Sequence, residues 1–170
     1  MLDAKAARLA AFDLLARKSW SGRELGQRLR RRGAPAEVAR DVVAELTARG
    51  YVDDQAFARW WAEARARGRQ IGSARLRQEL LAKGIPRELA TAAVTAAFEE
   101  TPESERAMEA GRRRLRALLT GRRDRVAARL GDYLLRRGYP PAVARSTVRR
   151  LLAEHVGEVP PEAGDDGSGV

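Results

Sequence analysis

The stretch LGQRLRRRGAPAEV, residues 25–38, has two further copies in this 170-residue chain. They are LRQELLAKGIPREL at residues 76–89 and LGDYLLRRGYPPAV at residues 130–143. The glycines of the three copies (Gly33, Gly84 and Gly138) recur at intervals of about 50 residues, which is typical of a tandem array of small helical units. The chain is therefore expected to be a repeat protein.

Each copy has the pattern of two helices joined by a tight turn. Leucines four residues apart lie on one face of a helix. The glycine suits a left-handed residue just beyond the helix end, and the basic residue before it complements the negative end of the helix dipole. The proline two residues later can open the next helix, because its missing N–H is not needed there. The copies thus predict three helix–turn–helix joints.

Apolar periodicity predicts one more helix before each joint, roughly at residues 4–18, 54–67 and 102–119. No run alternates as a strand does, so the predicted fold is all-α. We expect three tandem three-helix, helix–turn–helix-like repeats and a disordered acidic tail, at residues 1–52, 53–101, 102–156 and 157–170. Since units of about 50 residues are marginal alone, the repeats are expected to stack into an elongated, curved array.

Two helix starts carry capping signals. Ser21-Gly-Arg-Glu24 has the form of a capping box, in which the serine oxygen accepts a backbone N–H and the glutamate reaches back. Asp53 and Asp54 precede an apolar-periodic helix. We interpret them as N-cap and first-turn acids, with a metal-binding pair as the alternative.

The helix that follows Asp54 holds a cluster of aromatic residues. Phe57, Trp60, Trp61 and Ala64 follow the spacing of a buried helical face, so most of this aromatic surface is expected in the core. An exposed tryptophan that stacks on a nucleic-acid base is the alternative.

The formal net charge of +10 is unevenly distributed. Base exceeds acid by about five in the first repeat, about one in the second and about eight in the third, whereas the tail has only acids. Genome composition can explain the preference for Arg over Lys, but it does not explain the excess of base over acid. The pattern favours an extended polyanionic partner that is contacted at two places.

Composition and motifs argue against several classes of protein. Cysteine is absent, which fits a reducing compartment, and no apolar run reaches the roughly 18–20 residues of a membrane span. A signal peptide is not indicated, so a cytoplasmic protein without membrane contact is expected. His155 is the only histidine, and there is no phosphate-binding GxxxxGK(S/T) loop. We therefore expect no catalytic residue, metal or cofactor, and no enzyme activity.

Four motifs occur in order along the chain: Ser21-x-x-Glu24-Leu25-x-x-x-Leu29-x-x-x-Gly33, Leu46-x-x-x-Gly50-Tyr51-Val52-Asp53-Asp54-x-x-Phe57-Ala58, Gly72-x-x-Arg75-Leu76-x-x-Glu79-Leu80-x-x-Lys83-Gly84-Ile85 and Leu134-x-Arg136-Arg137-Gly138-Tyr139. This ordered set resembles the RecX family, the bacterial regulators of the RecA recombinase. The resemblance implies three tandem three-helix repeats that bind RecA filaments on DNA. It also implies modulation, usually inhibition, of ATP hydrolysis and strand exchange in DNA repair, homologous recombination and the SOS response. Leu76 replaces the family's usual Ile, and the acidic tail lies outside the resemblance.

The predicted contact surface consists of arginines on or beside the second helices, off the leucine face. They are Arg28, Arg31 and Arg32 in the first repeat, Arg67, Arg69, Arg75 and Arg77 in the second, and Arg125, Arg129, Arg136 and Arg137 in the third. Such a surface can track phosphates or an acidic protein, and a solvated helix face is the alternative. We expect a monomer that binds the RecA filament, and single- or double-stranded DNA weakly and in a salt-dependent way, restraining ATP turnover or filament growth by steric and electrostatic effects.

Two other functions fit parts of the pattern. A free-standing DNA-binding protein could place basic helix–turn–helix units in a groove. Against this alternative, the joints lack a cluster of Asn, Gln and Arg directed at base edges. A helical scaffold for an unrelated acidic protein is the third possibility.

Overall fold

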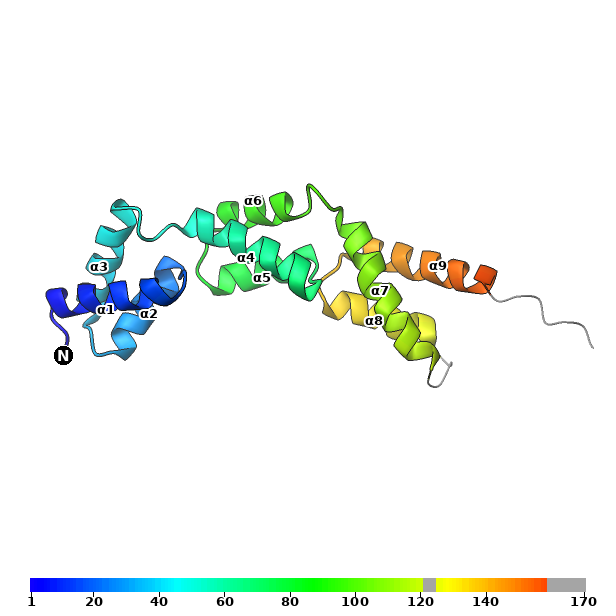
Figure 1. The fold of residues 1–170 in the computed structure, drawn as a ribbon, viewed down its shortest axis with the longest axis horizontal. Coiled ribbons are helices and arrows are strands. Elements are labelled where there is room, and N and C mark those ends of the chain that lie inside the picture. Colours follow the sequence, from blue (N-terminus) through cyan, green and yellow to red (C-terminus); the bar gives the residue numbers. More distant parts are fainter. Residues whose placement is uncertain (121–124, 159–170) are drawn as a thin grey trace, which may run out of the picture. The chain divides into compact units, whose positions relative to one another are not determined.

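The structure is a computed structural model that describes residues 1–120 and 125–158, with side chains up to residue 155. Within these ranges the chain forms helices and connecting turns, so the all-α prediction is confirmed there (Figure 1). The chain divides into two compact units, Met1–Pro102 and Glu103–Val170.

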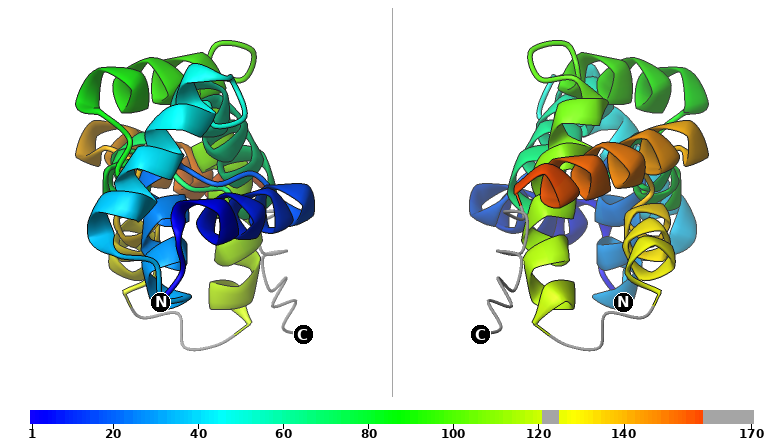
Figure 2. Two further views of the ribbon diagram at one scale, coloured as in Figure 1. Left: turned by 90° about the vertical axis from the view of Figure 1, so that its left-hand side faces the viewer. Right: turned by 90° about the vertical axis from the view of Figure 1, so that its right-hand side faces the viewer.

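Helices pack in groups of three, as the repeated joints predicted. The first unit holds two bundles, made of α1 (Ala4–Arg17), α2 (Gly22–Arg31) and α3 (Ala36–Ala48), and of α4 (Asp54–Arg69), α5 (Ser73–Ala82) and α6 (Arg87–Ala97). The second unit holds one bundle, made of α7 (Glu103–Leu119), α8 (Val126–Arg136) and α9 (Pro141–Glu158). In every bundle the third helix contacts both of the others (Figure 2).

The same backbone motif ends the second helix of each bundle. The left-handed glycines Gly33, Gly84 and Gly138 have φ angles of 95°, 83° and 86°. The residue after each glycine donates its N–H to the carbonyl of the second leucine; the pairs are Ala34 with Leu29 (3.1 Å), Ile85 with Leu80 (3.1 Å) and Tyr139 with Leu134 (3.2 Å). This is the Schellman arrangement, which satisfies carbonyls that the helix end leaves free. The predicted joints are confirmed.

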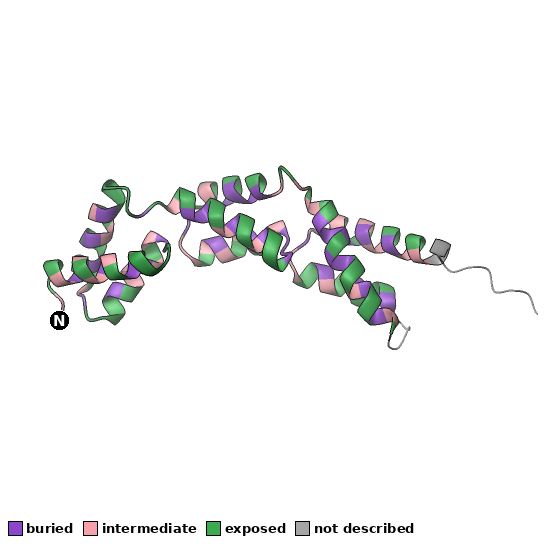
Figure 3. Ribbon diagram, viewed as in Figure 1, coloured by how far each residue is buried: buried purple, intermediate pink, exposed green. Residues whose placement is uncertain are grey.

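The repeated leucines form the centre of each bundle. Their side chains are fully buried: Leu25, Leu29, Leu76, Leu80, Leu130 and Leu134. Figure 3 shows in purple the buried positions that alternate with exposed ones along the helices. The residues that follow the glycines, Ala34, Ile85 and Tyr139, are buried beside these leucines. Each joint therefore turns the chain and also supplies an apolar side chain to the core.

The predicted aromatic stripe of α4 is partly wrong. Phe57 is buried and Trp61 is half-buried, but Trp60 is 57% exposed and Ala64 is exposed as well. The rest of the buried face consists of alanines: Ala58, Ala62 and Ala66. These small side chains let α4 lie close to α6, which leaves Trp60 on the solvent side.

Polar contacts join the two bundles of the first unit. Ser21 Oγ accepts the N–H of Glu24 (3.2 Å), as the capping box predicted, and it donates to the carbonyl oxygen of Lys83 (2.7 Å). The glutamate differs from the prediction, because its Oε1 pairs with Lys83 Nζ at 2.7 Å. The N–H of Gly22 is donated to Asp54 Oδ1 (2.8 Å). Residues that start α2 and α4 therefore also tie one bundle to the next.

The C-terminal end of the last helix differs from the prediction. The acidic tail was predicted from residue 157, whereas α9 continues to Glu158. The remainder of that predicted tail lies outside the described residues.

Candidate functional site

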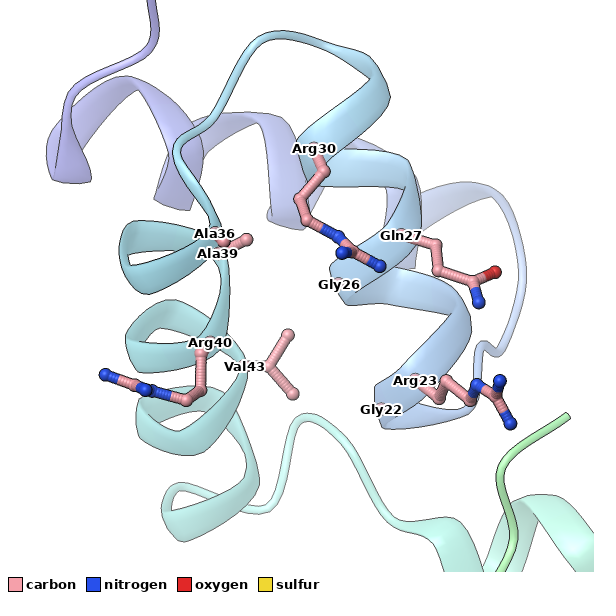
Figure 4. Close-up of a pocket in the computed structure, with 9 residues that line it drawn as sticks. All are labelled: Gly22, Arg23, Gly26, Gln27, Arg30, Ala36, Ala39, Arg40 and Val43. Carbon is pink, nitrogen blue, oxygen red and sulfur yellow. The ribbon is translucent and has the colours of Figure 1, made fainter.

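A groove runs between α2 and α3 in the first bundle, and two glycines of α2 line it. A Cβ atom placed on Gly22 or Gly26 would make an ordinary van der Waals contact with a methyl group of Val43, at 3.4 or 3.7 Å, so the absence of these side chains leaves open space above Val43. Ala36 and Ala39 continue the apolar wall on α3, and the groove has a volume of about 380 Å³ (Figure 4). The floor of this α2–α3 groove is therefore apolar, and the side chains that form it are small.

The rim of the α2–α3 groove is basic. Arg23, Gln27 and Arg30 follow one another along α2 at helical spacing, and Arg40 lies opposite on α3. In Figure 4 the guanidinium group of Arg30 is directed along α2 towards Gly26. Among the described residues, no carboxylate is within ion-pair distance of Arg23 or Arg30, and Arg40 meets only the exposed neighbour Asp41 at 3.3 Å. Such a rim attracts phosphate or carboxylate groups.

The arginines of α2 that were predicted as contact residues differ from the arginines that line the groove. Arg28, Arg31 and Arg32 are exposed, and the guanidinium group of Arg28 lies 4.1 Å from the ring centre of Trp20. None of the three lines the α2–α3 groove. The signal that could have located the groove is the pair of glycines four residues apart on α2, since residues at that spacing share one face of a helix and glycines leave that face open.

The predicted arginines of the second bundle lie among acidic side chains. Arg67 pairs with Glu63 at 2.8 Å and Arg75 with Glu79 at 3.4 Å. Arg69 is exposed at the end of α4, and Arg77 is half-buried on α5. These ion pairs are consistent with the small net charge of the second repeat and leave less free positive charge than the first bundle offers.

Glu79 forms a bidentate, half-buried ion pair in that bundle. Arg65 binds both carboxylate oxygens, with Nη2–Oε1 and Nε–Oε2 distances of 2.7 and 2.8 Å, and Trp61 Nε1 donates at 3.3 Å. Burial acts to raise the pKa of Glu79, but the hydrogen bonds and charge of Arg65, with help from Trp61 and Arg75, hold this pKa below its usual value. The carboxylate therefore stabilises the folded chain in its ionised form.

We expect Glu79→Gln to lower the free energy of unfolding of the first unit by about 1–2 kcal/mol at pH 7. Because the pKa of Glu79 is lower in the folded chain, its contribution is complete above the unfolded pKa and is lost as the pH falls through the folded pKa. Urea unfolding at pH 7 and below pH 4 should therefore show the difference from wild type shrinking in acid. Glu63→Gln, at an exposed ion pair, is the matched control and should change little at either pH.

The predicted arginines of the third bundle cluster on α8. Arg129 and Arg136 are exposed on this helix, away from its buried leucines. Arg125 lies at the N-cap in a left-handed conformation (φ 61°), one residue before the helix. Arg137 ends the helix, and its guanidinium group lies 4.9 Å from the ring centre of Tyr133. The structure thus places all four on one helix or its ends.

The described residues hold no group of three His, Cys, Asp or Glu side chains that could bind a metal ion. Burial raises the pKa of the Tyr139 phenol, which keeps this core group protonated. Within the ranges described, no helix is both long and apolar enough to pass through a membrane.

Comparison with known proteins assigns the family. The family profile "RecX, first three-helix domain" matches residues 7–46, and "RecX, second three-helix domain" matches residues 53–94. The Regulatory protein RecX of Streptomyces coelicolor is 35% identical over 161 residues, which cover 95% of this chain and 85% of that protein. The Regulatory protein RecX of Thermus thermophilus is 38% identical over 148 residues, covering 87% and 92%.

Solved structures show the same fold. The crystal structure of RecX from Lactobacillus salivarius matches with a TM-score of 0.77 at 14% identity, covering 88% of this chain and 97% of that one. A second crystal structure, of a regulatory protein RecX, matches with a TM-score of 0.76 at 19% identity, covering 89% and 73%. From the identity to the curated relatives and its extent, this chain belongs to the RecX family of regulatory proteins.

Proposed function

We propose that this chain is a non-enzymatic modulator of the RecA recombinase that acts in the cytoplasm. It binds the RecA–DNA filament and restrains ATP hydrolysis, strand exchange or filament growth, with inhibition as the main effect. The observation that carries the proposal is 35% identity, over 95% of the chain, to a protein named Regulatory protein RecX. Its biological setting is then DNA repair, homologous recombination and the SOS response.

The basic surfaces supply the means of contact in this proposal. The α2–α3 groove adds Arg23, Arg30 and Arg40 to the arginines predicted from the sequence, and α8 offers Arg129 and Arg136. Guanidinium groups bind carboxylates and phosphates in a bidentate way, so both the protein and the DNA of a filament are suitable partners. Binding by such groups weakens with salt, and a monomer that holds neighbouring filament subunits restrains their movement by steric effects.

The test of this proposal compares two concentrations of the wild-type chain. We expect suppression of the DNA-dependent ATPase of RecA to begin well below the concentration at which the chain coats the same DNA without RecA. An ATPase titration gives the concentration at which suppression begins. Fluorescence anisotropy of labelled single-stranded DNA gives the concentration at which the chain coats DNA without RecA. If ATPase suppression begins only when bare DNA is coated, the free-standing DNA-binding function replaces the proposed one.

A further inference from the structure

A second cavity in the first unit differs in character from the α2–α3 groove. It lies between α1 and α4, has a volume of about 730 Å³, and is lined mainly by aromatic and aliphatic side chains. The largest of them are Phe12, Leu15, Trp20, Tyr51, Phe57 and Trp60. This α1–α4 cavity is within the size range of ligand-binding pockets in proteins.

Part of this aromatic wall is open to solvent. Trp60 is 57% exposed and Tyr51 is 56% exposed. The wall is also ordered by contacts, since Tyr51 packs edge to face against Phe12 with ring centres 5.2 Å apart, and Trp60 packs beside Phe57 at 6.2 Å. Leu9, which is 61% exposed, lies three residues before Phe12 and extends the apolar face of α1. Contiguous exposed apolar surface of this kind marks an interaction site.

The charge of the α1–α4 cavity separates it from the basic surfaces. None of its lining residues is Lys or Arg, although the chain has a net charge of +10. Its one ionisable carboxylate is Asp53, whose Oδ1 also caps α4 by accepting the N–H groups of Gln55 and Ala56, both at 2.9 Å. Lys18 and Arg28 lie over the ring of Trp20, yet neither lines the cavity. A phosphate backbone beside Asp53 is disfavoured, whereas a basic residue is favoured.

We propose that the α1–α4 cavity receives an apolar side chain of the RecA protein, carried next to a basic residue that meets Asp53. The inference rests on the proposed function and adds to it a protein-specific contact, distinct from the electrostatic contacts of the arginines. Trp60 and Tyr51 are the anchors, because exposed aromatic rings on an ordered wall lose little conformational freedom on binding and bury a large area. The cavity then provides specificity for the recombinase, whereas the arginines bind any polyanion.

The experiment measures two affinities for each variant by fluorescence anisotropy. One is for RecA filaments assembled on single-stranded DNA with a non-hydrolysable ATP analogue, and the other is for the same DNA alone. We expect Trp60→Gln to weaken filament binding about tenfold or more, as truncation of an interface aromatic does, and to leave DNA binding unchanged. Trp60→Phe should restore most of the filament affinity, since it keeps an aromatic ring.

Ala92→Gln is the matched control, because it introduces the same side chain at an exposed helix position of the same unit, on α6, outside the cavity. It should bind both partners as the wild type does. Equal filament binding by wild type and Trp60→Gln would overturn the inference. So would a parallel loss of filament and DNA binding, which would identify the cavity as a nucleobase site. A wild-type chain that binds DNA but shows no preference for the filament refutes the proposed function itself, and the inference with it.

Discussion

Reversing the charges of Arg30 and Arg40 together is expected to weaken the suppression of RecA's ATPase by roughly 30- to 150-fold at physiological salt. Both side chains are exposed on the rim of the α2–α3 groove. Charge-assisted contacts of this kind contribute about 1–1.5 kcal/mol each, and glutamates in their place repel the same acidic partner. The measurement is the concentration of Arg30→Glu/Arg40→Glu that halves the ATPase rate on single-stranded DNA.

The matched control is Arg59→Glu with Arg87→Glu, two exposed arginines of the second bundle that line none of the basic surfaces described above. Both double variants change the net charge equally, so long-range attraction is lowered by the same amount. If both weaken suppression equally, the effect comes from net charge and the groove is not a contact site. Reversing Arg129 and Arg136 extends the assay to α8, and unchanged suppression there would contradict the predicted contacts of the third bundle.

The joints could be predicted from the sequence because each depends on neighbouring residues. A left-handed residue after a helix strongly favours glycine, as Gly84 shows with its φ of 83°. Leucines such as Leu76 and Leu80 stand four residues apart before it, and Pro86 follows. A stretch of about a dozen residues thus specifies the helix, the turn and the start of the next helix. Three copies of this stretch predicted that the helices group in threes.

The orientation of α4 could not be predicted in the same way. The helical spacing that starts from Phe57 and follows the tryptophans selects Trp60 and Ala64, whereas the structure buries Ala58, Ala62 and Ala66. Alanine is compatible with either side of a helix, so only the close approach of α6 decides which face is buried. The exposure of Trp60, on which the α1–α4 cavity depends, follows from that tertiary contact.

The contacts between bundles also lay beyond the sequence pattern. Glu24 and Lys83 are separated by 59 residues, yet their side chains pair at 2.7 Å. The capping box predicted a local role for Glu24, and a tertiary ion pair replaced it. The same limit applies to the α2–α3 groove, because Arg40 joins Arg23 and Arg30 only after α3 folds back against the glycines of α2.

Replacing Gly111 by valine is expected to lower the free energy of unfolding of the second unit by about 2–3 kcal/mol. Gly111 is buried where α7 meets α9, and a Cβ atom there would lie 2.6 Å from Leu151 Cδ1 and 3.2 Å from Thr147 Cγ2. Leu151 and Thr147 are each only 2% exposed, so neither can move aside into solvent. Valine has only a slightly better helix propensity than glycine, by about 0.3 kcal/mol, so this gain offsets little of the crowding.

Gly131→Ala in the same unit separates the effect of crowding from that of helix propensity, because it replaces a helical glycine where no atom is crowded. Gly131 lies inside α8, and its nearest neighbour, Val148 Cγ2, is 3.9 Å from the position of an added Cβ. This substitution should stabilise the unit by about 0.5 kcal/mol, since the added methyl group makes an ordinary van der Waals contact. Chemical unfolding followed by circular dichroism measures both variants. If Gly111→Val proves as stable as wild type, α7 and α9 are not in the close contact described, because a branched side chain at this position would meet the buried side chains of Leu151 and Thr147.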